Sequence, residues 1–369
     1  MLIDEGRLRI VLGGLGDQIL NGIADFVRVV NKDNEVVFIN DAMKEVLGGD
    51  PEKLTCAVPF DSCFLCNPLI TLRSLQTGEI IQREESYQQD TYSVKTSPIW
   101  GDEGKIVGAV EVYRNKSREK KLQMELIEKN RIATKEMAQA KNIQHSLLPK
   151  KGFYGNVKVN HIYIPSDVIS GDMLDVFQIN EDVLGFYMSD TVGHGFASGM
   201  TTLFIRETLR NLSYRELMIP SRTLEEIHRK FNSLGLDIEI YFTIFYGVYN
   251  KRENRLYFSN GGHNCAPIKI TSEGCTPIKI TGRPISRIFE KSSYEDFFID
   301  IHCGDRFLLY TDGITESKNE KQENFGLERL IALGNQYKVD LLENILDYRN
   351  QFTWGDQKDD ISALLLDIY

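Results

Sequence analysis

The 369-residue sequence predicts an α+β protein in which two sheet-containing domains are joined by a helical linker. Three observations support this class. In residues 16–114, short β-favouring stretches alternate with turn residues, as in a small antiparallel sheet. Residues 115–148 contain no glycine or proline and are rich in charge, which favours one long helix. From residue 150 to residue 369, strand and helix patterns follow one another without internal repeats.

The composition narrows the function classes. The chain has 43 basic and 53 acidic residues, a formal net charge of −10, and an acidic chain repels nucleic-acid phosphates. No apolar run approaches the ~18 residues of a membrane span, and Asp4 and Glu5 stand where a signal peptide would carry positive charge. We therefore expect a cytoplasmic protein with neither a nucleic-acid nor a membrane partner.

Residues 16–114 predict a small antiparallel sheet with short helices, after an N-terminal segment of residues 1–15. Stretches 26–30 and 36–39 form a hairpin pattern around turn residues 31–34. Asn40 is suited to cap a helix over residues 42–47, and strand patterns follow at 92–96 and 106–113. This order, ending in SVKTSPIWGDEGKIVGAVEVYR, resembles a PAS sensory domain. An unrelated small α+β domain is the alternative.

Three cysteines cluster in the loop that follows the first predicted helix: Cys56, Cys63 and Cys66. The Cys-x2-Cys pair could hold zinc or an iron–sulfur cluster, which would sense a metal or redox signal. A closed site usually needs four ligands, and Asp61 or another chain would have to supply the fourth. The alternative is idle thiols in a reducing compartment.

The linker, residues 115–149, predicts a helix that ends at Pro149. Apolar residues at heptad spacing, namely Leu122, Leu126, Ala133, Ala140, Ile143 and Leu147, indicate a thin coiled-coil seam. Lys129 and Glu136 interrupt it, so its stability should be marginal. We expect a homodimer through the N-terminal domain and this linker, with Ile143, Leu147 and Leu148 packed on the C-terminal domain.

Aspartates in the C-terminal region stand at predicted strand ends or beside glycine turns. They are found in the segments SGDMLD, SDTVGHG, YTDG and KDDIS. Strands that deliver several carboxylates to one sheet edge would create an oxygen-rich site for Mg²⁺ or Mn²⁺. A single Asp-Gly after a strand is usually a turn, but four such sites in one region indicate a metal centre.

These segments resemble a known family. The chain is similar, over about residues 138–369, to the SpoIIE/RsbU branch of the protein phosphatase 2C-like (PPM) metal-dependent serine/threonine phosphatases. The motifs that carry the resemblance are, in order, AQAKNIQHSLLPK, ISGDMLDVF, SDTVGHGFASGM, YFTIFYGVYN, LYFSNGGHNCAPI, GDRFLLYTDGITES, FGLERL and DDISALLL. The resemblance implies an α-β-β-α sandwich over residues 150–369 and hydrolysis by water activated between two ions.

The resemblance also implies roles for individual residues. Asp190 would bridge two Mn²⁺ or Mg²⁺ ions and Thr191 would add its main-chain carbonyl. Asp172, Asp312 and Asp359 would supply the other carboxylates. The sequence departs from the family pattern at Ser170, where the family has glycine, and at Met173 and Leu174, where it has aromatic residues.

The histidines leave alternatives open. His194, in the glycine-rich turn after Asp190, could donate a proton to the leaving serine oxygen or could order the turn. His263 in the NGGHN segment is interpreted as structural. A histidine kinase would use His145 as phosphoacceptor, but neither its usual sequence context nor a glycine-rich ATP lid is found.

The family resemblance also implies a partner. The substrate would be a phosphorylated STAS-type anti-anti-sigma protein, whose dephosphorylation switches transcription. A further alternative is a non-catalytic docking protein, which would have lost a metal carboxylate. All four carboxylate positions are present in this chain.

Overall fold

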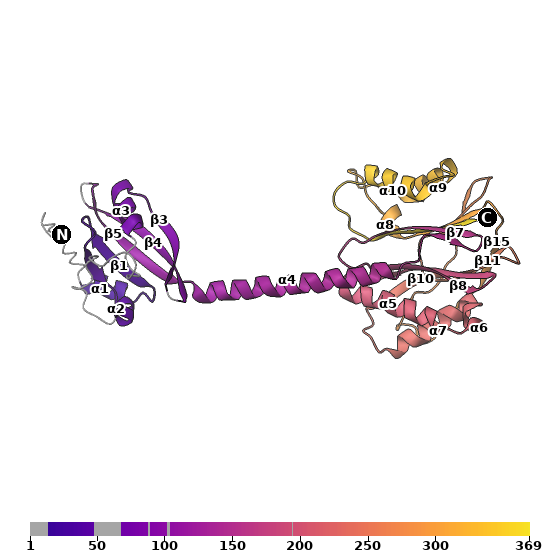
Figure 1. Cartoon of the computed structure of the whole chain (residues 1–369), viewed down its shortest axis with the longest axis horizontal. Coiled ribbons are helices and arrows are strands. Elements are labelled where there is room, and N and C mark those ends of the chain that lie inside the picture. Colours follow the sequence, from indigo (N-terminus) through magenta and orange to yellow (C-terminus); the bar gives the residue numbers. More distant parts are fainter. Residues whose placement is uncertain (1–13, 48–67, 88, 102–103, 194) are drawn as a thin grey trace. The chain divides into compact units, whose positions relative to one another are not determined.

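The computed structural model describes residues 14–47, 68–87, 89–101, 104–193 and 195–369. The chain divides into two compact units, Met1–Ile132 and Ala133–Tyr369, and the division falls inside helix α4 (Ser117–Ser146). Both units and the helix are drawn in Figure 1. Within the described ranges, no helix has both the length and the apolar content needed to cross a membrane.

The first unit contains a five-stranded antiparallel sheet with strand order β2-β1-β5-β4-β3. Helix α2 contacts β1, and helix α3 contacts β4 and β5. The strands are β1 (Phe26–Asn31), β2 (Val36–Ile39), β3 (Ile81–Tyr87), β4 (Asp90–Trp100) and β5 (Ile106–Asn115), and the helices are α1 (Gly14–Asn21), α2 (Asp41–Leu47) and α3 (Pro68–Thr77). The sequence analysis had missed β3, α1 and α3.

The predicted hairpin and its helix cap are confirmed. Asn34 takes a positive φ of 62° in the turn between β1 and β2, a conformation that asparagine tolerates better than most residues. Asn40 Oδ1 accepts from the backbone N–H of Met43 at 3.2 Å, as an N-cap does. It also accepts from the N–H of Val27 at 3.0 Å, so the same side chain fastens α2 to β1.

Helix α4 extends over 30 residues and is mostly exposed to solvent. Leu122 and Leu126 of the predicted seam are 56% and 59% exposed in the single chain. The helix ends at Ser146, three residues before Pro149, where the sequence predicted its end. Leu147 and Leu148 pack against buried clusters of the second unit, but Ile143 is 57% exposed, so its predicted packing was wrong. Gln144, one residue further along the helix, is buried instead.

The second unit consists of two antiparallel sheets, each covered by helices on its outer face (Figure 1). The first sheet is ordered β15 (Phe297–Asp300), β11 (Arg255–Gly261), β10 (Tyr241–Asn250), β9 (Val183–Thr191), β8 (Asp172–Asn180), with β14 (Ile285–Ser286) beside β10. The second is ordered β13 (Cys275–Pro277), β12 (Ile268–Ile270), β16 (Arg306–Tyr310), β17 (Ile361–Ile368), β7 (Val157–Ile164), β6 (Gly152–Tyr154).

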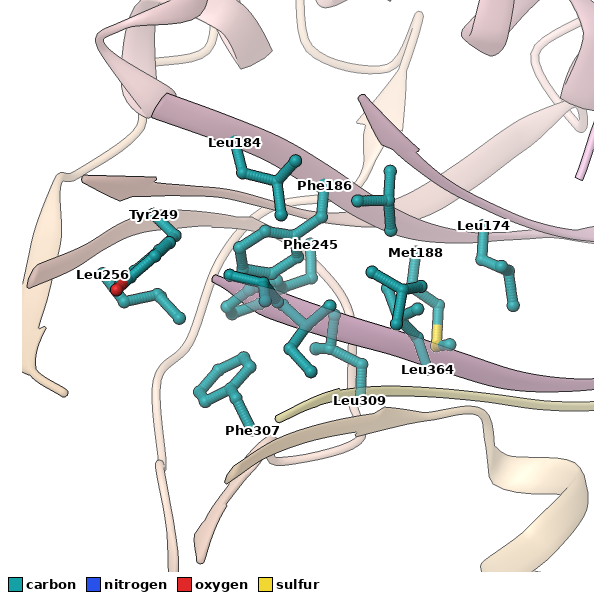
Figure 2. Close-up of a cluster of buried hydrophobic side chains, with 14 of the residues drawn as sticks. Leu174, Leu184, Phe186, Met188, Phe245, Tyr249, Leu256, Phe307, Leu309 and Leu364 are labelled. Carbon is teal, nitrogen blue, oxygen red and sulfur yellow. The ribbon is translucent and has the colours of Figure 1, made fainter. Parts of the chain in front are cut away.

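Apolar residues from both sheets form the central core of this unit. Figure 2 shows Phe186, Met188 and Phe245 of the first sheet facing Phe307 and Leu364 of the second. The outer face of the first sheet packs against α5 (Phe196–Arg210), α6 (Tyr214–Leu217) and α7 (Pro220–Ser233). The second packs against α8 (Asp312–Thr315), α9 (Gly326–Gln336) and α10 (Leu341–Phe352). The layers are therefore helix, sheet, sheet, helix.

Candidate functional site

Both sheets of the second unit deliver aspartates to one place. Asp172 begins β8 and lies directly opposite Asp190 on the neighbouring strand β9. Asp312 follows β16 and Asp359 precedes β17, and these two strands are also neighbours. The Thr311 hydroxyl donates to Asp172 Oδ2 at 2.9 Å, which joins the two sheets at this point. The structure thus places the four aspartates that the sequence singled out on neighbouring strand ends of the two sheets.

Asp172 is the most deeply buried of the four, with 2% of its surface exposed. Its backbone carbonyl accepts from the Tyr163 hydroxyl at 3.0 Å, and its backbone N–H donates to Ser170 Oγ at 3.0 Å. Burial, followed by the negative charge of Asp190, raises the pKa of its carboxyl group well above the ordinary value. The fold therefore holds this carboxylate firmly but does not supply the charge that would stabilise it.

Asp190 lies opposite Asp172 and within range of the negative charges of the second sheet. Burial, followed by the charges of Asp312, Asp359 and Asp360, raises the pKa of Asp190 to about 7. All the charges named here are negative, so their mutual repulsion falls when a cation is bound. Such a group of like charges is a common sign of a functional site.

Thr191 and Gly171 bring two backbone segments into close contact beside these carboxylates. The N–H of Thr191 donates to the carbonyl of Gly171 at 3.0 Å. A Cβ atom at Gly171 would lie 2.9 Å from the Thr191 carbonyl oxygen, closer than side chains normally approach. Glycine at this position lets the Thr191 carbonyl lie next to the segment that carries Asp172.

Asp312 and Asp359 are more accessible than Asp172. Asp312 is partly buried and Asp359 is exposed. Asn264 Nδ2 lies 3.4 Å from Asp312 Oδ2, and Asp359 Oδ1 accepts from the N–H of Asp360 at 2.8 Å. Burial, followed by the charge of Asp312, raises the pKa of the Asp359 carboxyl group. Exposure therefore increases across the site, from buried Asp172 through partly buried Asp190 and Asp312 to exposed Asp359.

The sequence analysis had given no role to Asp360. Its carboxylate is buried and accepts hydrogen bonds from the loop before β8: Oδ1 from the N–H and hydroxyl of Ser166, and Oδ2 from the Ser170 hydroxyl and the Gly171 N–H, at 2.6–2.8 Å. Asp360 therefore fixes the backbone that leads to Asp172. The sequence shows a second aspartate beside Asp359, but the pattern alone does not indicate what that aspartate does.

Asp175, from the same motif as Asp172, faces away from the site. The two residues are three positions apart on β8, so their side chains lie on opposite faces of the strand. The Asp175 carboxylate accepts a bidentate pair of hydrogen bonds from Arg210 of α5, from Nε to Oδ2 and from Nη2 to Oδ1, each at 2.9 Å. It fastens α5 to the sheet.

The histidines lie in different settings. His194 falls outside the described residues, so its two interpretations stay predictions. His263 is buried, its Nε2 lies 3.0 Å from the Tyr310 carbonyl oxygen, and burial lowers its pKa to about 4. This agrees with the structural role expected of His263. Cys56, Cys63 and Cys66 also lie outside the described residues.

The donor chemistry fits Mg²⁺ or Mn²⁺. The side chains offer carboxylate oxygens, which hard divalent ions prefer. In the described part of the chain, no three His, Cys, Asp or Glu side chains lie close enough together to hold a metal ion as a group. Mg²⁺ retains several waters and needs only one or two carboxylates, so aspartates that are not close enough to form a complete cage are still compatible with such ions.

Solved structures of PP2C-type domains share the fold of this chain. The SiaA-PP2C domain of Pseudomonas aeruginosa superposes with a TM-score of 0.56 at 18% identity, covering 65% of this chain and 98% of that domain. A structure of the PP2C phosphatase domain and a fragment of the regulatory domain of SpoIIE from Bacillus subtilis superposes with a TM-score of 0.50 at 14% identity, covering 82% and 86%. At these identities the likeness establishes the fold.

The family is established by sequence. Residues 180–369, more than half of the chain, match the family described as Stage II sporulation protein E (SpoIIE), and the chain belongs to it. Phosphoserine phosphatase RsbP of Bacillus subtilis is 29% identical over 190 residues, 49% of this chain and 45% of RsbP. Phosphoserine phosphatase RsbU of the same organism is 23% identical over 195 residues, 52% and 57%. The chain thus spans about half the length of these two relatives.

Proposed function

We propose that the second unit is a metal-dependent phosphatase that acts on phosphoserine or phosphothreonine of a partner protein. The observation that carries the proposal is the group of aspartates from both sheets, in which burial and like charges raise the pKa of Asp190 to about 7. The family and the names of its relatives RsbP and RsbU support the same reaction.

Asp190 would bridge two ions, with Asp172, Asp312, Asp359 and the Thr191 carbonyl as further ligands. Two divalent ions bound there would supply a water of lowered pKa and would neutralise charge on the phosphoryl oxygens. The chain itself orients the ligands: Thr311, Tyr163 and Asp360 hold the Asp172 segment by hydrogen bonds. Mn²⁺ or Mg²⁺ is the ion expected from the oxygen ligands.

Hydrolysis of p-nitrophenyl phosphate with added Mn²⁺ tests this proposal. Asp190→Asn and Asp312→Asn should each reduce the rate more than tenfold, a loss above about 1.4 kcal/mol of transition-state stabilisation. Asp347→Asn is the matched control, because Asp347 is exposed on α10. A folded wild-type protein without Mn²⁺-dependent activity would favour the docking protein, and a substituted bridge residue with a near-normal rate would refute the two-ion assignment.

The partner would be a phosphorylated STAS-type anti-anti-sigma protein, as the resemblance to RsbU implies. The test compares a phosphorylated STAS protein with a short phosphoserine peptide of the same local sequence. A recognised partner should be hydrolysed with a much higher kcat/KM than the peptide. Equal values would contradict recognition of the folded partner.

The first unit would act as a PAS-like sensor. Its antiparallel sheet and short helices are consistent with that assignment, and its interior holds a buried ion pair between Arg28 and Glu111, 2.5 Å apart. Cys56, Cys63 and Cys66 would bind zinc or an iron–sulfur cluster. Metal analysis of anaerobically purified protein tests this, with Cys63→Ser as the variant that should lose the metal. A colourless, metal-free wild-type protein would refute it.

A further inference from the structure

The last turn of α4 reaches the segment that carries Asp172. Gln144 is 2% exposed and is the only buried residue of α4, all of which the structure describes. Its Nε2 donates to the Ser170 carbonyl oxygen at 2.9 Å, and its Oε1 accepts from the Ser170 N–H at 3.1 Å. The side-chain amide therefore pairs with both backbone groups of Ser170, as an adjacent strand would.

The same amide also holds α5. Nε2 of Gln144 donates to Thr202 Oγ1 at 3.1 Å, and the Thr202 hydroxyl donates to the carbonyl of Gly199 at 2.7 Å. A Cβ atom at Gly199 would lie 2.2 Å from Cγ2 of Ile169, so α5 packs directly against the residue before Ser170. Three segments of the chain thus meet at Gln144: the end of α4, the segment before β8, and α5.

The next residue of α4 provides a second contact toward the same aspartate. The ring of His145 packs edge-on against Tyr163, with ring centroids 5.4 Å apart. The Tyr163 hydroxyl in turn donates to the backbone carbonyl of Asp172. Both Gln144 and its neighbour therefore contact groups that are hydrogen-bonded to the Asp172 segment.

We propose that Gln144 is a positioning residue that fixes the backbone of Ser170 and thereby the place of Asp172 in the metal site. The inference rests on the proposed function, since it takes Asp172 as a ligand. Each hydrogen bond of a buried amide is costly to break, because the partner is left unpaired. A displacement of the α4 end therefore moves Ser170, and with it Asp172 two residues further on, and the affinity for the ion falls.

The test uses the full chain with Gln144→Leu, which keeps the size of the side chain but removes its hydrogen bonds. Gln139→Leu is the matched control, because Gln139 is exposed on the same helix. Calorimetric titration with Mn²⁺, without substrate, measures the dissociation constant. Amide hydrogen exchange of residues 166–175 in metal-free protein measures how strongly the backbone of this segment is protected. Gln144→Leu should raise the Mn²⁺ dissociation constant several-fold and accelerate exchange in this segment, and Gln139→Leu should change neither.

Several outcomes would overturn the inference. Gln144→Leu could lower the melting temperature and yet, while folded, leave the Mn²⁺ dissociation constant and the amide exchange rates at their wild-type values. That result would show that Gln144 has a structural role alone. If Gln144→Leu does not fold, Gln144→Met, which is unbranched like glutamine, replaces it with the same readouts and the same expected changes. A wild type that binds no Mn²⁺ would refute the proposed function, and the exchange data would still decide whether Gln144 holds the segment.

Discussion

The backbone N–H of Gly171 donates a 2.7 Å hydrogen bond to Oδ2 of Asp360, a residue 189 positions further along the chain. This bond connects the loop before β8, which leads to Asp172, to the segment before β17, which contains Asp359. The single carboxylate of Asp360 thus connects the loop that leads to Asp172 with the segment that carries Asp359.

Asp360→Asn should weaken this connection. Each oxygen of Asp360 accepts from at least two donors, so an asparagine side chain would point its NH₂ group at donors in either orientation. Leaving buried donors unpaired costs about 1–3 kcal/mol, which urea unfolding would measure. The Mn²⁺ dissociation constant should rise as well. Asp356→Asn, on an exposed residue nearby, is the control, and equal stability of the two variants would contradict the role of Asp360.

The metal-free protein should lose stability as the pH rises toward neutrality, through Asp190. Its pKa is about 7 in the folded chain, against about 3.9 for an unfolded aspartate. Between these pH values the folded state binds more protons than the unfolded state. The contribution of Asp190 to the free energy of unfolding is therefore fully present below about pH 4 and is lost as the pH rises through about 7. In EDTA, Asp190→Asn should therefore gain stability relative to wild type as the pH rises from about 4 to about 7.

Urea unfolding of both proteins across this range measures the difference. His263, whose pKa is lowered to about 4, contributes a slope of opposite sign between about pH 4 and about pH 6.5. Since His263 is the same in both proteins, its contribution cancels in the difference. A difference that does not change with pH would contradict the raised pKa of Asp190.

A fragment that begins at residue 133 should fold, and one that begins at residue 150 should be less stable. The second unit begins at Ala133, and the shorter fragment lacks Gln144, Leu147 and Leu148, which contact its interior. Thermal unfolding of both fragments tests this. Equal melting temperatures would show that the end of α4 contributes nothing to the fold of the second unit.

Leu126→Glu tests the proposed dimer. Leu122 and Leu126, one turn apart on α4, are 56% and 59% exposed in the single chain, and adjacent exposed apolar residues are typical of an interaction surface. Sedimentation of the full chain at micromolar concentration should give a dimer, and Leu126→Glu should shift it toward monomer and change the phosphatase rate several-fold. Met124→Glu, the same kind of change at an exposed position of α4 outside the predicted seam, is the control. A monomeric wild type, or unchanged kinetics, would reduce α4 to a tether.

Elements with strong local signals were predicted from the sequence. The hairpin of β1 and β2 has β-branched residues around an asparagine turn, and α4 lacks helix-breaking residues. Strand β3 was missed because its sequence, IQREESY, is polar and exposes most of its side chains, so pairing with β4 decides its structure. For the same reason, local propensity is a weaker guide to strands than to helices.

The site was predicted in part. The aspartates were found because each follows a strand or glycine pattern, but their supports come from distant segments. Gln144 was missed because the heptad pattern considers only apolar residues. That pattern predicted Ile143 as the packed residue instead. Only the fold shows that a buried amide here finds its partners on Ser170 and Thr202.

The repulsion among the four aspartates has a consequence for the lifetime of the protein in a cell. An ion that binds the folded chain and not the unfolded chain adds to stability by mass action, about 2.7 kcal/mol at a concentration one hundred times its dissociation constant. Proteases degrade the unfolded fraction, which shrinks correspondingly. Under the proposed function, divalent-ion starvation would therefore lower the abundance of this protein, in addition to its activity.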